Sequence, residues 1–93
     1  MIKTFKNRYT AAVFLRNETR KFGPNVSQVA AEKLRTLDQA ANLDVLGLIP
    51  GNRLEALKGD RKGQFSIRIN SQFRVCFYWR NGHAYEVEIV DYH

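Results

Sequence analysis

The stretch QFSIRINSQFRVCFYWRNGHAYEVEIVDYH, residues 64–93, decides the fold of this chain. Apolar and polar side chains alternate through three short runs, and β-branched and aromatic residues stand on one side of each run. Such alternation is typical of half-buried antiparallel strands, so we expect a three-stranded meander with one apolar and one charged face. The apolar side consists of Phe65, Ile67 and Ile69, then Phe73, Val75, Phe77 and Trp79, then Tyr85, Val87 and Ile89.

The first turn of this meander sets two arginines face to face. A three-residue loop over residues 70–72 places Arg68 opposite Arg74. Like charges directly opposite each other destabilise a sheet, so this pair needs an explanation. Either Glu88 faces Arg74 from the next strand and offsets the repulsion, or the two arginines bind an anion. The pattern alone leaves both interpretations open.

The second turn admits two registers. A two-residue loop, Asn81-Gly82, sets Glu86 opposite Phe77 on the apolar face, and the cost of burying that carboxylate should exclude it. A three-residue loop that begins at Arg80 pairs Phe77 with Tyr85 instead and keeps the carboxylates on the charged face. We therefore predict the longer loop.

Length, charge and cysteine content bound the class of protein. The 93 residues and their 44% hydrophobic content predict one domain over residues 1–93. Between residues 53 and 74, six cations stand against two carboxylates in a chain of net charge +6, which favours a polyanionic partner, nucleic acid first. The single Cys76 excludes an internal disulfide and predicts a buried thiol in a reducing cytoplasm. No secretory or membrane-spanning run is visible.

The first half of the chain is predicted to be mostly helical. A short strand is expected over residues 2–5, followed by a helix over residues 8–21 that ends at Gly23-Pro24. A further helical turn is expected over residues 43–49 and a short strand over residues 53–57.

The strongest helical pattern covers residues 25–41, where Asn25 or Ser27 can cap the start. Its apolar side chains recur at steps of three and four and so form one stripe. We expect this stripe to pack on the apolar face of the sheet, which gives a two-layer α+β fold. The stripe consists of Val26, Val29, Ala30, Leu34, Leu37 and Ala41.

No complete catalytic or metal-binding motif follows from the residues alone. The two histidines, His83 and His93, lie in a turn and at the terminus, so no metal site is expected. The charged turn over residues 58–63 lacks the ending of a phosphate-binding loop, and a solvated hairpin loop explains it more simply. Asp91, Tyr92 and His93 offer acid–base groups, although a plain tail is the simpler interpretation.

The string RLEALKGDRKGQFSIRINSQFRVCFYWRNG, followed by VEIVDYH, resembles the HigB toxins (host inhibition of growth) of the RelE/ParE superfamily. The resemblance extends over nearly the whole chain from its MIKTF opening. It implies an N-terminal strand, two helices and a C-terminal antiparallel sheet. It also implies a cytoplasmic toxin of a type II toxin–antitoxin system that cleaves mRNA on the ribosome without metal or other cofactor. The implied partners are a HigA-type helix-turn-helix antitoxin, the ribosome with its mRNA, and operator DNA reached through the antitoxin.

The resemblance also implies roles for individual residues. Lys58 and Arg74 would hold the scissile phosphate and its transition state while the ribose 2′-hydroxyl attacks. Asp91, Tyr92 and His93 would stack on or orient the nucleotide and move protons. The expected RNA-binding residues are Arg53, Arg61, Lys62 and Arg68.

One position departs from the family pattern. Some members carry histidine in an LHPL string where this chain has Glu55 in LEAL. A carboxylate can act as a general base there but cannot supply positive charge, so the catalytic role of Glu55 stays open. This departure keeps one alternative alive, a non-catalytic module that acts as a DNA co-repressor or an antitoxin decoy. The other alternative is a ParE-like gyrase poison.

Overall fold

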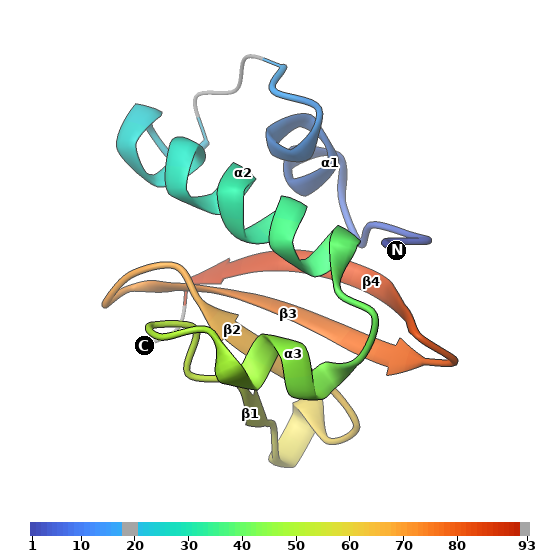
Figure 1. Cartoon of the computed structure of the whole chain (residues 1–93). Coiled ribbons are helices and arrows are strands. Elements are labelled where there is room, and N and C mark those ends of the chain that lie inside the picture. The colour runs from blue at the N-terminus through green and yellow to red at the C-terminus, as the bar shows by residue number, and fades with distance from the viewer. Residues whose placement is uncertain (18–20, 92–93) are drawn as a thin grey trace.

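The computed structural model describes residues 1–17 and 21–91. Within these residues, three α-helices pack on a four-stranded antiparallel sheet of order β1-β2-β3-β4 (Figure 1). This arrangement confirms the predicted α+β fold. The helices are α1 (Arg8–Phe14), α2 (Pro24–Gln39) and α3 (Leu43–Leu48), the strands are β1 (Glu55–Ala56), β2 (Phe65–Arg68), β3 (Phe73–Arg80) and β4 (His83–Asp91), and a 3-10 turn spans Gly59–Arg61.

Helix α1 is shorter than predicted. It ends at Phe14, because Arg16 takes a left-handed φ of 57°. The N–H of Arg16 then bonds to the carbonyl of Val13, and the N–H of Asn17 bonds to the carbonyl of Ala12. This pair of bonds is the Schellman arrangement that closes helix C-termini. The prediction of helix as far as residue 21 was wrong, since backbone geometry and not a glycine stops the helix.

Helix α2 begins as a Gly-Pro pair dictates. Gly23 is the N-cap at φ 79°, and Pro24 takes the first helical position, where its missing N–H costs nothing. The predicted side-chain cap from Asn25 or Ser27 was therefore wrong, because both residues lie inside the first turn.

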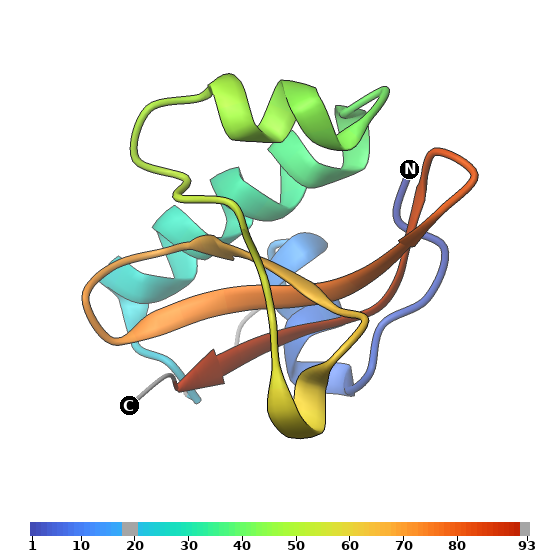
Figure 2. The same cartoon turned by 90° about the horizontal axis from the view of Figure 1, so that it is seen from below.

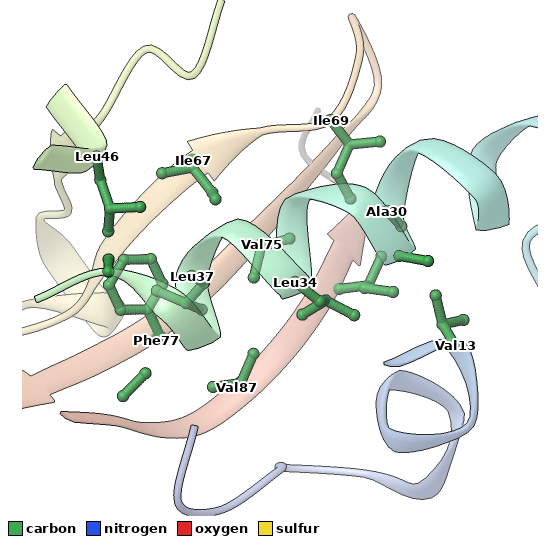
Figure 3. Close-up of a cluster of buried hydrophobic side chains, with 14 residues drawn as sticks. Val13, Ala30, Leu34, Leu37, Leu46, Ile67, Ile69, Val75, Phe77 and Val87 are labelled. Carbon is green, nitrogen blue, oxygen red and sulfur yellow. The ribbon is translucent and has the colours of Figure 1, made fainter. Parts of the chain in front are cut away.

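The core lies between α2 and one face of the sheet (Figure 3). Leu34 and Leu37 of the predicted stripe are fully buried, whereas Val29 is 37% exposed and Ala41 lies at the surface. Helix α1 packs against α2 and draws Ala31 into the core, which rotates the buried side of α2 away from Val29. Figure 3 shows Val13 of α1 at one end of this cluster and Leu46 of α3 at the other, around Ala30, Ile67, Ile69, Val75, Phe77 and Val87.

The β3–β4 hairpin has the turn that the sequence argument rejected. Arg80 pairs with His83, and Trp79 pairs with Ala84, so the loop is the two-residue Asn81-Gly82. Asn81 and Gly82 have φ values of 52° and 81°, as a type I′ turn requires. The prediction of a three-residue loop was wrong because it assumed an uninterrupted ladder between the two strands.

A β-bulge at Glu86 removes the conflict that had excluded this turn. Glu86 adopts φ 52° and stands with Val87 opposite the single residue Phe77. The hydroxyl of Thr4 accepts the Glu86 N–H at 2.8 Å, which supports the bulge from the N-terminal segment. Glu86 is consequently exposed while Val87 is fully buried. Tyr85, predicted in the core, lies on the opposite face instead, because the extra residue reverses the alternation.

The N-terminal segment runs along β4 in both views (Figure 1 and Figure 2). It forms two isolated parallel bridges, Ile2 with Ala84 and Phe5 with Val87, in place of the predicted strand. The bulge at Glu86 lies between these bridges and prevents a continuous ladder.

The two short predicted elements have different outcomes. The helical turn expected over residues 43–49 is α3, whose Leu46 is fully buried. The strand expected over residues 53–57 is reduced to β1, because Arg53 takes a left-handed φ of 46°. In the part of the chain that the structure describes, none of the helices has the length and apolar character needed to cross a membrane.

Candidate functional site

The sheet face turned away from the core carries polar and charged side chains in cross-strand rows. Residues directly opposite each other on neighbouring strands point to the same face, so the register defines these rows. Ser66 and Cys76 lie in the middle of one row and are fully buried, although α2 covers the other face. We call this side of the sheet the open face. From β1 to β4, this row consists of Glu55, Ser66, Cys76 and Glu88.

The second row contains the two arginines. Arg68 faces Arg74, which confirms the predicted register of the first hairpin. Arg68 donates from Nε to the carbonyl of Asn70 at 3.0 Å, toward the hairpin loop. Arg74 donates in the other direction, to Ser66. The two guanidinium groups therefore donate to different oxygens, Arg68 toward the hairpin loop and Arg74 toward Ser66 and Arg53.

Glu88 does not face Arg74. The two-residue turn and the bulge each move the β3–β4 register by one residue from the predicted one, so Val90 stands opposite Arg74 and the predicted Arg74–Glu88 pairing was wrong. Glu88 instead forms an ion pair with Arg61 at 3.2 Å. Arg61 also donates to Gln64 at 3.3 Å. The contact between Arg61 and Glu88 ties the 3-10 turn to β4 across the open face.

Three hydrogen bonds fix the guanidinium of Arg74. Its Nε donates to the hydroxyl of Ser66 at 2.7 Å. Its Nη2 donates to the carbonyl of Arg53 at 2.6 Å and to the carbonyl of Ser66 at 3.4 Å. Arg74 is half-buried, so a cation is held in a defined orientation beside the buried middle of the open face.

Cys76 shows how closely the charged groups surround this centre. Burial raises the pKa of the Cys76 thiol, Arg61 and Arg74 lower it, and Glu88 and Glu55 raise it. The four charged residues therefore lie around one buried sulfur. The net upward direction keeps the thiol protonated at neutral pH. The predicted buried thiol is confirmed.

The basic loop, residues 58–63, lies on the side of the sheet away from α2 (Figure 1). The β2–β3 register places Arg74 on the same side. Lys58 is exposed and precedes the 3-10 turn, and Lys62 is exposed just after it. The side chain of Arg53 is exposed, while its carbonyl accepts from Arg74. The fold thus brings the predicted cations of this loop to the open face.

Asp91 lies at the end of β4, on the other side of the strand from Glu88 and Val90. The register places it opposite Phe73, and Gln72 Nε2 donates to its carboxylate at 3.0 Å. Asp91 borders a hollow of about 510 Å³ that Tyr9 and Lys21 also line. A hydrogen bond from Arg8 lowers the pKa of Tyr9, with a further lowering from the nearby charges of Arg8 and Lys21.

Tyr92 and His93, both predicted as catalytic, lie outside the described residues, so their roles stay predictions. Among residues 1–17 and 21–91, no group of three or more histidine, cysteine or acidic side chains could hold a metal ion.

Two groups in this site were not predicted from the sequence, the Ser66 hydroxyl and the Arg53 carbonyl. Ser66 stands opposite Cys76 and is therefore a diagonal cross-strand neighbour of Arg74. The register of the first hairpin was predicted correctly, and it already made Ser66 a neighbour of Arg74. The Arg53 carbonyl had no signal, because a left-handed arginine cannot be read from residue type.

Comparisons with known proteins place this chain in a family. Residues 3–93 match the family described as HigB-like toxin, the RelE-like toxin HigB of type II toxin–antitoxin systems. The chain is 34% identical over 85 residues to Toxin HigB-1 of Vibrio cholerae, covering 90% of both chains. It is 31% identical over 93 residues to Endoribonuclease HigB of Proteus vulgaris, covering both chains completely. A Staphylococcus aureus YoeB–YefM complex contains a chain of similar fold, with a TM-score of 0.62, 17% identity and coverage of 100% and 98%.

Proposed function

Because this chain belongs to the HigB-like family of RelE-like toxins of type II toxin–antitoxin systems, we propose that it cleaves mRNA on the ribosome as a metal-independent endoribonuclease. A relative that matches its full length is named an endoribonuclease. The observation that carries the proposal is the Arg74 guanidinium, which Ser66 and Arg53 fix on the open face of a strongly basic chain.

The proposed chemistry is transfer of the phosphoryl group within the RNA, from the 5′-oxygen of the next nucleotide to the ribose 2′-oxygen. The ribose 2′-oxygen forms a bond to the adjacent phosphorus, and the bond from phosphorus to the 5′-oxygen of the next nucleotide breaks. Negative charge grows on the non-bridging oxygens in the transition state. Arg74 donates to these oxygens from a preorganised position, and Lys58 adds an exposed cation from the basic loop.

Two proton transfers complete the reaction. A base removes the proton of the 2′-hydroxyl, and an acid returns a proton to the departing 5′-oxygen. We assign these transfers to His93 and Asp91, and we assign stacking on the base to Tyr92. The Asp91 carboxylate lies on the opposite face of the sheet from Arg74 and has to leave Gln72 to reach the phosphate. Glu55 is the alternative base, since it begins the row that contains Ser66.

The proposed partners follow from the family. A HigA-type helix-turn-helix antitoxin neutralises the toxin, and the pair represses its own operon from operator DNA. Support for an antitoxin comes from the solved complexes that share this fold, which are toxin–antitoxin complexes of YoeB with YefM. The proposed location is the cytoplasm, where ribosomes and mRNA are found.

Induced expression followed by mapping of mRNA 5′ ends tests the proposed function directly. We expect new 5′ ends within translated codons, in frame, and only where ribosomes translate. Plasmid supercoiling serves as the parallel measurement. Relaxed or broken DNA with intact mRNA would point to a gyrase poison, and intact mRNA and DNA with a repressed operator would point to a co-repressor.

The basic loop should supply attraction to RNA more than chemistry. Replacing Arg61 and Lys62 together by glutamine should weaken ribosome binding and reduce the slope of log K against log salt by about two. The rate of a single turnover at saturating ribosome should fall far less than the affinity. Binding is measured by sedimentation across a salt titration.

The matched control is Glu88→Gln, which breaks the ion pair with Arg61 but keeps both loop cations. If Glu88→Gln reproduces the loss of affinity, the ion pair and not the charge explains the result. Unchanged affinity of the double variant across the salt titration would show that this loop faces away from RNA.

A further inference from the structure

We infer that Ser66 and Asn52 are positioning residues for Arg74, and that Arg53 takes part through its backbone carbonyl. Deletion of the Ser66 hydroxyl should therefore impair catalysis without removing any group that touches RNA. The effect on cleavage rests on the proposed function. The anchoring of the guanidinium is independent of it and can be measured without RNA.

Ser66 holds one edge of the guanidinium. Its hydroxyl accepts from Nε of Arg74 at 2.7 Å, and its carbonyl lies 3.4 Å from Nη2. The side chain is fully buried, and a buried hydroxyl is costly unless it is paired. A hydrogen bond from a charged donor is short and strong, so this contact restrains the guanidinium more than a neutral bond would.

Arg53 holds the next nitrogen through its main chain. Nη2 of Arg74 donates to the Arg53 carbonyl at 2.6 Å. That carbonyl points at Arg74 because Arg53 takes φ 46°, a conformation that side-chain-bearing residues rarely adopt. Such a conformation persists only where the surrounding structure enforces it.

Asn52, the preceding residue, enforces this conformation from the interior. It is fully buried, its Nδ2 donates to the carbonyl of Leu46 in α3 at 3.1 Å, and its Oδ1 accepts from Lys33 of α2 at 2.5 Å. Its backbone N–H donates to the carbonyl of Ile49 at 3.2 Å, and its own carbonyl accepts from the backbone N–H of Arg68 at 2.6 Å. Three contacts to α2, α3 and β2, and a fourth to Ile49 at the end of α3, therefore fix the residue before Arg53.

These contacts form a continuous chain from the helical layer to the proposed catalytic cation. An arginine side chain has several rotatable bonds, and an unrestrained guanidinium must be ordered during each reaction. Donors that are already oriented stabilise developing charge without that reorganisation. The buried contacts thus orient the Arg74 guanidinium before RNA binds.

The direct measurement is hydrogen exchange at the Arg74 Nε–H in ¹⁵N-labelled protein without RNA. The signal is assigned by its absence in Arg74→Lys. Ser66→Ala should raise the exchange rate at least about tenfold, because it removes the acceptor of that proton. Ser66→Thr, which restores the hydroxyl, should return the rate toward that of the unaltered protein. An exchange rate that is unchanged in Ser66→Ala would overturn the inference.

Single-turnover kinetics test the functional consequence. Ser66→Ala should lower the cleavage rate at saturating ribosome about tenfold while ribosome affinity changes less than about twofold. A loss that appears only in affinity would contradict a positioning role. If Arg74→Ala itself cleaves at the normal rate, the proposed function of Arg74 fails, although the exchange result still stands.

Arg53 and Asn52 complete the test. Arg53→Gly retains the carbonyl and accepts positive φ, so the Arg74 Nε–H should exchange within about twofold of the original rate. Fast exchange in this variant would exclude the backbone role. Lys33→Met removes one bond to Asn52 but keeps an apolar stem, and should speed exchange about threefold. Lys33→Met replaces Asn52→Ala as the test if Asn52→Ala does not fold. An unchanged exchange rate of the Arg74 Nε–H in Lys33→Met would show that Asn52 does not position Arg74.

Discussion

Replacing Arg74 by alanine should lower the rate of mRNA cleavage at least about 100-fold and should abolish growth inhibition. The guanidinium is the only cation of the proposed catalytic set that the described residues show held by a side-chain hydroxyl and a backbone carbonyl. Its loss removes charge from the proposed transition state, whereas we expect ribosome binding to depend mainly on the other cations. Cleavage is measured by primer extension on translated mRNA at saturating toxin.

The stability of the Arg74 variant needs a separate measurement. Removing Arg74 leaves the buried hydroxyl of Ser66 without this donor, which should cost about 1–2 kcal/mol. In a domain of this size, that cost lowers the melting temperature by roughly 5–15 °C. The chain should therefore remain folded at the assay temperature.

Arg74→Lys is the matched control, since it keeps the charge but cannot offer two nitrogens to Ser66 and Arg53 at once. We expect it to recover little of the cleavage rate. Normal cleavage by folded Arg74→Ala would remove Arg74 from the site, and full recovery by Arg74→Lys would show that charge suffices without orientation.

The parts of the fold that depend on local pattern could be predicted from the sequence. The alternation around residues 70–72 fixed the first hairpin, because its loop and both strands lie within a few residues of one another. The long apolar stripe likewise identified α2 and its packing on the sheet. Local alternation also placed Arg68 and Arg74 on the same face.

The second hairpin could not be predicted, because its register depends on a distant residue. The bulge at Glu86 is supported by Thr4, which is 82 positions away in the chain. Without that contact, the penalty for a carboxylate on the apolar face appeared decisive. The wrong register also gave the wrong face for Tyr85 and the wrong partner for Glu88.

The candidate site shows the same division between local and distant information. Residue types identified the cations, but not what orients them. The orientation of Arg74 depends on a left-handed Arg53 and on a buried Asn52 that two helices and β2 hold in place. The bonds of Asn52 to Lys33 and Arg68 join elements far apart in the sequence, so periodicity carries no trace of them.

Removing Tyr92 and His93 should reduce cleavage by about 100-fold or more while leaving the fold intact. The apolar pattern of β4 ends at Ile89, which is buried, and Asp91 is already exposed. The truncation stops after Asp91 because this residue pairs with Phe73 and accepts from Gln72. Melting temperature and antitoxin binding should change little, and both are measured beside cleavage.

Single substitutions separate the roles within the tail. If His93 removes the 2′-hydroxyl proton, the cleavage rate should rise with pH as the imidazole loses its proton. His93→Gln should slow cleavage and flatten this rise. Tyr92→Phe should retain stacking, and Tyr92→Ala should lose it. A folded truncated protein that binds ribosomes and cuts mRNA at the normal rate would exclude Tyr92 and His93 from catalysis and leave Asp91 and Glu55 as the groups to test.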